Sequence, residues 1–179
     1  MLVLEAILSS ASERELPFSL KSVILPVIYD QAGKKIIQAV KKMRHRPALV
    51  LSLGEGKDQF KLELLTHNLD SSKTADNLGG LRQDVPIIAG GNAVLELSFA
   101  GKVASLCREQ GFEASPLLSQ SAGGFVCNNT AYHVMHHFDR EEWPIDYGFI
   151  HVPSVEVAGL NVKNMATAIL KLILAGGYN

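Results

Sequence analysis

The stretch ALVLSL, residues 48–53, decides how this chain folds. It is an unbroken, mostly apolar run, which is typical of a strand buried on both faces of a parallel sheet. Pro47 precedes it and ends a basic amphipathic segment, residues 30–46, in which Ile36, Ile37 and Val40 share one face. The turn GEGKDQ follows, and residues 60–67 then alternate in polarity. This central region therefore predicts a helix followed by two strands.

Helices and strands alternate through the rest of the chain. We expect further helices at 2–8, 93–110, 125–138 and 157–175, and further strands at 20–28, 112–118 and 147–152. This order predicts an α/β fold, a three-layer αβα sandwich with a largely parallel (mixed) central sheet. Residues 69–92 are rich in Gly, Asp, Asn and Ser and predict a long functional loop.

Composition limits the class of protein. The 179 residues suit a single domain spanning 1–179. Because the net charge is only −1 and charged residues make up 20%, electrostatics favours neither a nucleic-acid partner nor an acidic membrane surface. No apolar run approaches the roughly 18 residues of a membrane span. With two cysteines and no signal-peptide pattern, the sequence predicts a cytoplasmic protein.

One cysteine lies directly before a helical pattern. In SAGGFVCNNTAYHVMHH, residues 121–137, small residues precede Cys127 and permit a sharp turn. A thiol in the first turn of a helix meets unpaired N–H groups and the positive end of the helix dipole, which favour the thiolate. The same backbone groups can stabilise an oxyanion. On this window alone, a buried structural thiol is the more frequent use of cysteine.

A nucleophilic cysteine needs a base and a group that orients the base. His151 ends the apolar strand at 147–152, where sites of α/β folds collect. Glu63 stands among apolar residues in the strand at 60–67, either facing solvent or paired. His133 and His137 have the i, i+4 spacing of a metal pair, but a polar helix face is the favoured interpretation because no HExxH pattern completes the pair.

Three separated windows together resemble the pyroglutamyl peptidase I family of cysteine peptidases. They are SAGGFVCNNTAYHVMHH, GFIHVP at 148–153, and LELLTHN at 62–68. His151 lies 24 residues after Cys127, and Asn68 lies five residues after Glu63, as in the family. The resemblance implies a phosphorylase/hydrolase-like fold and an enzyme that removes N-terminal pyroglutamate (5-oxoproline) from peptides. Cys127 would be the nucleophile, His151 the general base and later acid, and Glu63 the residue that holds the imidazole.

The resemblance also implies substrate-binding residues. Phe125 matches an aromatic wall of the lactam pocket, and Asn68 belongs to the glutamate motif. Lys73 stands where the family carries an arginine, ten residues after Glu63, and keeps the charge without the planar fork. The implied partners are peptides with N-terminal pyroglutamate and further copies of the chain in a homo-oligomer. The mechanism needs no metal and no cofactor.

The sequence departs from the family at its N-terminus. We find no segment matching the first strand and the Gly-Phe-x-Pro-Phe-Gly loop, which supplies the aromatic wall opposite Phe125. Met1 corresponds to a point inside or just before the first helix of the family. Three explanations stay open: a start codon assigned too late, an altered specificity in which the open side accepts a different acyl group, or a catalytically impaired or inactive homologue that serves as a scaffold or binding subunit.

The two cysteines provide a direct test of the nucleophile assignment. We expect iodoacetamide at pH 7 to alkylate Cys127 faster than Cys107, because only Cys127 occupies the predicted start of a helix. Peptide mass spectrometry over a time course measures both rates in one sample. Equal rates would count against Cys127 as an activated thiol.

Overall fold

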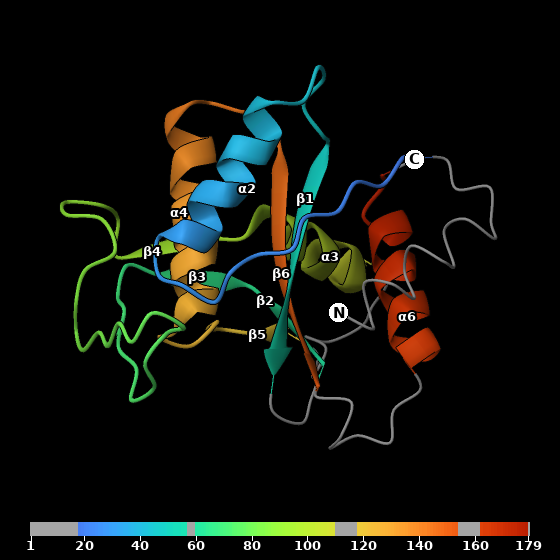
Figure 1. The fold of residues 1–179 in the computed structure, drawn as a ribbon. Coiled ribbons are helices and arrows are strands. Elements are labelled where there is room, and N and C mark those ends of the chain that lie inside the picture. The colour runs from blue at the N-terminus through green and yellow to red at the C-terminus, as the bar shows by residue number, and fades with distance from the viewer. Residues whose placement is uncertain (1–17, 57–59, 110–117, 154–161, 179) are drawn as a thin grey trace.

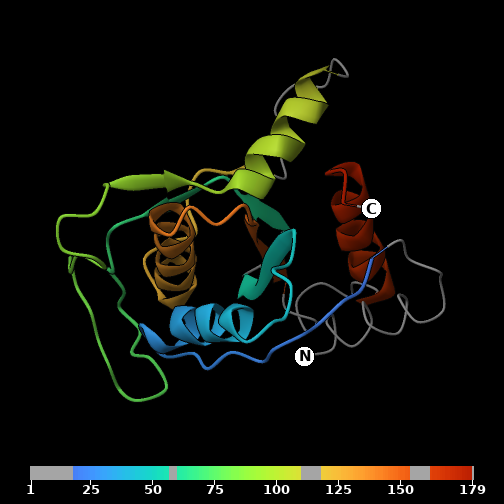
Figure 2. The same ribbon diagram turned by 90° about the horizontal axis from the view of Figure 1, so that it is seen from above.

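Two layers of helices enclose a central sheet. The computed structural model describes residues 18–56, 60–109, 118–153 and 162–178. Helices α2 (Gln31–Lys41) and α4 (Val126–Arg140) cover one face of the sheet, and α3 (Ser98–Glu109) and α6 (Val162–Ala175) lie on the other (Figure 1). The view from above shows the same separation (Figure 2). The predicted three-layer α/β arrangement is confirmed.

The main sheet has four strands in the order β1-β6-β2-β5. Strand β1 (Leu49–Gly56) pairs in parallel with β6 (Asp146–Pro153), and β6 pairs antiparallel with β2 (Lys61–Glu63). Strand β2 in turn runs parallel to β5 (Leu118–Ser119). The sheet is therefore mixed but mostly parallel, and the apolar strand that begins at Leu49 lies at one edge of the ladder.

The helices pack through regularly spaced apolar residues. In α4, Ala131, Val134, Met135 and Phe138 are buried, which is the i, i+3, i+4, i+7 spacing of one helix face. Helices α3 and α6 bury Phe99 and Ile169 among others on the opposite side of β6. Burying one such large side chain contributes about 1.5–3 kcal/mol, so the two layers stabilise the sheet from both faces.

The strand predicted at residues 20–28 is wrong. This segment has no strand or helix, and Val23, Ile24 and Val27 are exposed. A β-branched run becomes a strand only where it packs on a sheet and pairs with a neighbour, and Pro26 removes one ladder donor. Phe18, Leu20 and Leu25 instead pack against the core as irregular chain.

The strand predicted at 60–67 is divided at Leu64. The N–H of Leu64 donates to the carbonyl of Ser119 at 2.7 Å, whereas its carbonyl accepts from the N–H of Leu97 at 2.8 Å. The chain therefore passes from the main sheet into a two-stranded sheet, in which β3 (Leu65–His67) pairs antiparallel with β4 (Val94–Glu96). Strand β4 occupies residues for which a helix beginning at residue 93 was predicted, so that prediction is wrong at its start. The helix begins only at Ser98, a residue type favoured at helix starts.

Several predicted elements lie partly or wholly outside the described residues. These are the helix at 2–8, most of the strand at 112–118 and the first part of the helix at 157–175. Among the helices that are described, none has both the length and the apolar composition needed to cross a bilayer.

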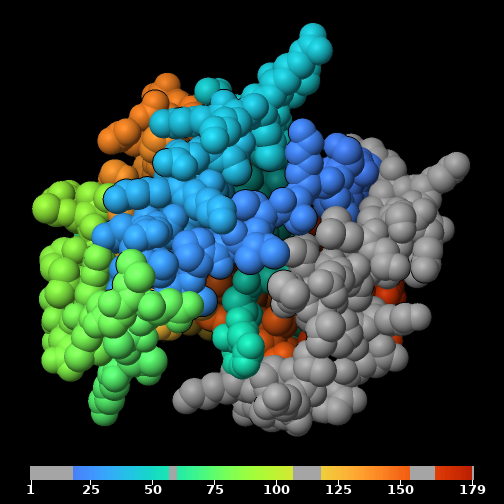
Figure 3. All heavy atoms as spheres, viewed as in Figure 1, coloured from blue at the N-terminus to red at the C-terminus, as the bar shows by residue number. Residues whose placement is uncertain are grey.

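The loop of residues 69–92 packs against the segment that leads into α2. It contains no helix or strand beyond an isolated bridge between Asp70 and Val85. The N–H of Tyr29 donates to Asp76 at 3.0 Å, and the N–H of Asn77 donates to the carbonyl of Val27 at 2.9 Å. Figure 3 shows the loop (green) lying directly against the segment that leads into α2 (blue).

Asn128 ties the first turn of α4 to β3. Its Oδ1 accepts from the Thr66 hydroxyl and from the N–H of His67, both at 2.9 Å. Its Nδ2 donates to the carbonyls of His67 at 2.9 Å and Leu69 at 3.0 Å. The side chain is fully buried and uses every hydrogen-bonding position, so it fixes the position of the first turn of α4 relative to β3.

We expect Asn128→Ala to lower the free energy of unfolding by about 3 kcal/mol, because it leaves the N–H and the carbonyl of His67 without their hydrogen-bond partner. The matched control is Asn77→Ala, an exposed position where a change within about 0.5 kcal/mol is expected. Urea denaturation measures both. A loss in the Asn128 variant no larger than in the control would contradict the role of this side chain.

Candidate active site

Cys127 lies in the first turn of α4, where the predicted helix begins. The chain segment just before Cys127 requires glycine at two positions. Gly123 has φ +82°, and a Cβ on Gly124 would lie only 2.3 Å from the Ser71 carbonyl oxygen. Cys127 is a free cysteine, and the residue as a whole is partly exposed. The thiol therefore stands beside first-turn N–H groups that have no partner within the helix and that favour negative charge.

Glu63 and His151 meet across the antiparallel pair of β2 and β6. Glu63 is in register with Phe149, so His151, two residues further along β6, is its diagonal neighbour on the same face. The two side chains close this distance, and His151 Nδ1 lies 2.7 Å from Glu63 Oε1. Glu63 is 2% exposed, which resolves the sequence alternatives in favour of the paired carboxylate.

His151 also contacts the thiol of Cys127. Burial lowers the pKa of the His151 imidazole, but hydrogen bonds with Cys127 and with Glu63 outweigh burial and raise this pKa to about 9. The imidazole is thus held between a carboxylate on one side and a thiol on the other. The structure brings together the three residues that the sequence windows predicted.

Gly54 makes room for this arrangement. It is in register with His151 across the parallel pair of β1 and β6. A Cβ at Gly54 would lie 2.8 Å from the Phe149 ring and 3.0 Å from Cys127 Sγ. Any larger residue would push against the ring or the sulfur, so the absence of a side chain here lets α4 sit close to β1.

Phe125, two residues before Cys127, contacts an aromatic ring from another segment. Its ring packs edge-on against Tyr29, with centroids 5.6 Å apart and an interplanar angle of 86°. Tyr29 is 4% exposed, whereas Phe125 is partly exposed. Tyr29 is not among the residues that the sequence windows predict, because no pattern near residue 29 indicates a contact with residue 125.

Asn68 and Lys73 belong to the segment that follows β3. The Asn68 amide bonds the loop backbone, with Nδ2 donating to the carbonyls of Ile88 at 2.8 Å and Gly91 at 3.2 Å. Its Oδ1 accepts from the N–H of Ile88 at 2.8 Å. Lys73 is exposed in the same loop. Their contact with a substrate stays a prediction.

The histidines of α4 bind different neighbours. His133 Nε2 lies 3.0 Å from Asp30 Oδ1, while the His137 ring packs edge-on against Trp143 with centroids 5.1 Å apart. Among the described residues, no group of three or more His, Cys, Asp or Glu side chains is arranged to hold a metal ion. This part of the chain thus offers no ligand set for a metal.

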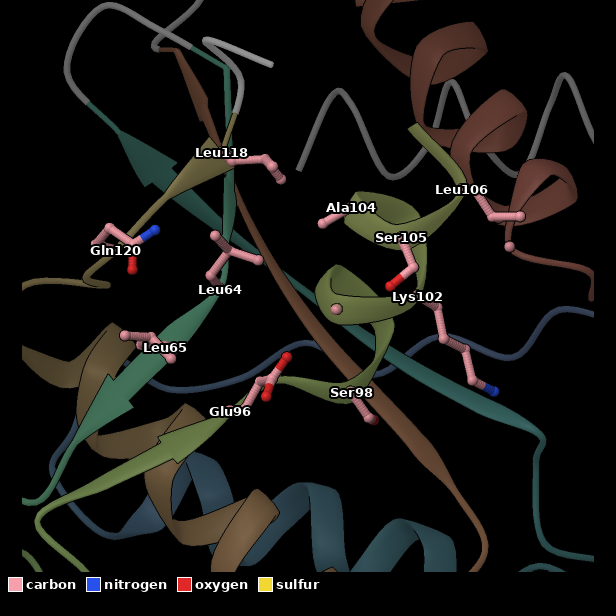
Figure 4. A pocket seen from close by; sticks show the side chains of 12 residues that line it. Leu64, Leu65, Glu96, Ser98, Lys102, Ala104, Ser105, Leu106, Leu118 and Gln120 are labelled. Carbon is pink, nitrogen blue, oxygen red and sulfur yellow. The ribbon is translucent and has the colours of Figure 1, made fainter. Parts of the chain in front are cut away.

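An open cavity of ≈ 860 Å³ lies elsewhere, beside α3. Figure 4 shows Leu64 and Leu118 on one side of it and Ala104 and Ser105 of α3 on the other. Its lining includes none of Cys127, His151 and Glu63. The cavity and the three-residue cluster are therefore separate features.

The pKa of His151 can be measured directly. Because this folded-state pKa, about 9, lies above the ordinary value of 6.5, imidazole protonation stabilises the fold fully below pH 6.5. That stabilisation is lost as pH rises through 9. We expect NMR titration of the ring to show a midpoint near pH 9, and Cys127→Ser to lower it, since the bond with Cys127 raises this pKa most. A wild-type midpoint near 6.5 would contradict the arrangement.

Comparison with known proteins identifies the family to which the chain belongs. A family model described as pyroglutamyl peptidase matches residues 16–174. Pyrrolidone-carboxylate peptidase from Gloeobacter violaceus is 35% identical over 137 residues, which cover 74% of this chain and 65% of the relative. The corresponding protein from Enterococcus faecalis is 28% identical over 154 residues, covering 84% of this chain and 70% of the relative.

Solved structures show the same fold. Pyroglutamyl peptidase I from Bacillus amyloliquefaciens superposes with a TM-score of 0.77 at 26% identity, covering 97% of this chain and 88% of that one. Pyrrolidone carboxyl peptidase from Fervidobacterium islandicum gives a TM-score of 0.75 at 25% identity, with coverage of 97% and 88%. Because the family model spans most of the sequence, this chain belongs to the pyroglutamyl peptidase family of hydrolases.

Proposed function

We propose that this protein is a cysteine peptidase that removes N-terminal pyroglutamate from peptides through Cys127, His151 and Glu63. The observation that carries the proposal is the 2.7 Å contact between His151 and Glu63, with the Cys127 thiol close enough to the same imidazole to raise its pKa. A nucleophile, a base and a group that orients the base are the parts that covalent hydrolysis requires. Membership of the pyroglutamyl peptidase family supports the substrate class.

The reaction proceeds through an acyl-enzyme. The Cys127 thiolate attacks the carbonyl carbon that joins pyroglutamate to the next residue, and the carbonyl oxygen becomes an oxyanion. Backbone N–H groups at the start of α4 stabilise this charge. His151, protonated and held by Glu63, gives its proton to the leaving amine as the C–N bond breaks. His151 then takes a proton from water, which attacks the thioester and releases pyroglutamate and the thiolate.

The lactam ring binds against Phe125. This ring stands two residues before the nucleophile and is backed by Tyr29, so an apolar wall lies close to the thiol. Lys73 and Asn68 are the further substrate-binding residues that the family resemblance implies. A homo-oligomeric assembly remains a prediction of the same resemblance, and a cytoplasmic location remains a prediction from the sequence.

The alternative is an impaired or inactive relative that serves as a scaffold or binding subunit. The chain spans 65–70% of the length of the curated relatives cited above. The pocket-forming loop of the family has no counterpart in this sequence. One activity measurement separates the two functions.

We expect the folded protein to hydrolyse a pyroglutamyl fluorogenic amide, and Cys127→Ala to lower kcat by about four orders of magnitude, because the nucleophile is lost. Cys107→Ala is the matched control and should retain wild-type kcat. Release of the fluorophore under initial-rate conditions gives both values. A folded wild-type protein with no activity above that of Cys127→Ala would establish the inactive alternative.

A further inference from the structure

Arg82 joins two carboxylates from distant segments. Its Nη2 donates to Asp30 Oδ2 at 2.6 Å, and its Nη1 donates to Asp30 Oδ1 at 3.0 Å and to Asp70 Oδ2 at 2.8 Å. Asp30 stands just before α2, whereas Asp70 and Arg82 belong to the loop of residues 69–92. A planar guanidinium can make both contacts at once, so Arg82 couples the loop to the beginning of α2.

The charges in this cluster depend on one another. The Asp70 side chain is fully buried, and those of Arg82 and Asp30 are 27% and 31% exposed. The hydrogen bond from Arg82 holds the pKa of Asp30 well below its ordinary value, and burial raises the pKa of Asp70. His133 also faces Asp30, with Nε2 3.0 Å from Oδ1. Without Arg82, two carboxylates would face each other around a half-buried site.

Both carboxylates bind Asn129, two residues after Cys127. Asn129 Nδ2 donates to Asp70 Oδ2 at 2.8 Å and to Asp30 Oδ1 at 3.2 Å. Its Oδ1 accepts from the N–H of Asp30 at 2.8 Å. Asn129 is fully buried, so these bonds determine where the first turn of α4 lies.

Arg82 also supports the residue two positions before Cys127. Its guanidinium stacks over the Tyr29 ring at 4.6 Å, and Tyr29 packs against Phe125. Asp30, next to Tyr29, has φ +60°, a left-handed conformation that non-glycine residues adopt rarely. The contacts with Arg82 and Asn129 therefore maintain a backbone turn that presents Tyr29 to Phe125.

We propose that Arg82 is a positioning residue for the Cys127 site, acting through Asp30, Asp70 and Tyr29 on Asn129 and Phe125, the residues that flank the thiol on either side. This inference rests on the proposed role of Cys127 as the nucleophile. Arg82 touches neither the thiol nor the imidazole in any contact described above. It sets the start of α4, and thereby the alignment of the thiol with His151.

The test uses the full chain and alkylation of Cys127 by iodoacetamide at pH 7, followed by mass spectrometry. We expect Arg82→Gln to slow alkylation about tenfold, because iodoacetamide reacts with the thiolate and a displaced thiol no longer has the His151 imidazolium beside it. Arg82→Lys should recover part of the rate, since lysine keeps the charge but not the fork. The matched control is Arg140→Gln at the other end of α4, where an exposed pair with Glu141 is lost and the rate should stay unchanged.

A double variant separates positioning from stability. Arg82→Gln with Asp30→Asn removes the charge imbalance, so its thermal midpoint should recover relative to Arg82→Gln while alkylation stays slow. Alkylation at the wild-type rate in the single variant, or in the double variant if the single one does not fold, would overturn the proposal and assign Arg82 to stability alone. Because alkylation needs no substrate, a wild-type protein that fails to cleave the pyroglutamyl amide would refute the proposed function without deciding this result.

Discussion

The position of β6 between two partner strands is the constraint on which the site depends. Strand β6 pairs in parallel with β1 and antiparallel with β2. These two registers place Gly54 opposite His151 on one side of β6 and Glu63 opposite Phe149 on the other. Since side chains alternate across a sheet, a slip of one residue would turn His151 to the opposite face, away from α4. Burial of Tyr147 and Ile150 within the core makes such a slip costly.

The thiol is positioned by hydrogen bonds as much as by apolar packing. Asn128 binds β3, and Asn129 binds Asp30 and Asp70, so the two residues after Cys127 hold α4 from two directions. Buried amides are costly unless their donors and acceptors are satisfied, and here they are. Unlike packed methyl groups, these bonds are directional, so they define the orientation of the first turn as well as its depth.

The spacing of apolar residues predicted those helices and strands whose pattern lies within one continuous segment of the chain. The apolar run at Leu49, the strand around His151 and the helix that begins at Val126 all appear close to the expected bounds. The segment at 20–28 failed because β-propensity has an effect only where a partner strand is present. The division of one strand at Leu64 was also beyond local patterns, because it depends on backbone bonds to Ser119 and Leu97, which other segments supply.

The residue types of the site follow from the sequence alone, since a cysteine, a histidine and a glutamate stand in windows with the spacing of a known family, and the α/β class of the fold follows from it as well. Three contacts are visible only in the folded chain: Glu63 is paired with His151, Gly54 lies next to the Cys127 sulfur, and Arg82 is joined to Asp30. The contact between Asp30 and Asn129 spans 99 positions of sequence, and that between Arg82 and Asp30 spans 52. Local propensities and motif spacing carry no information on such contacts, because the bonded groups belong to segments that only the folded chain places side by side.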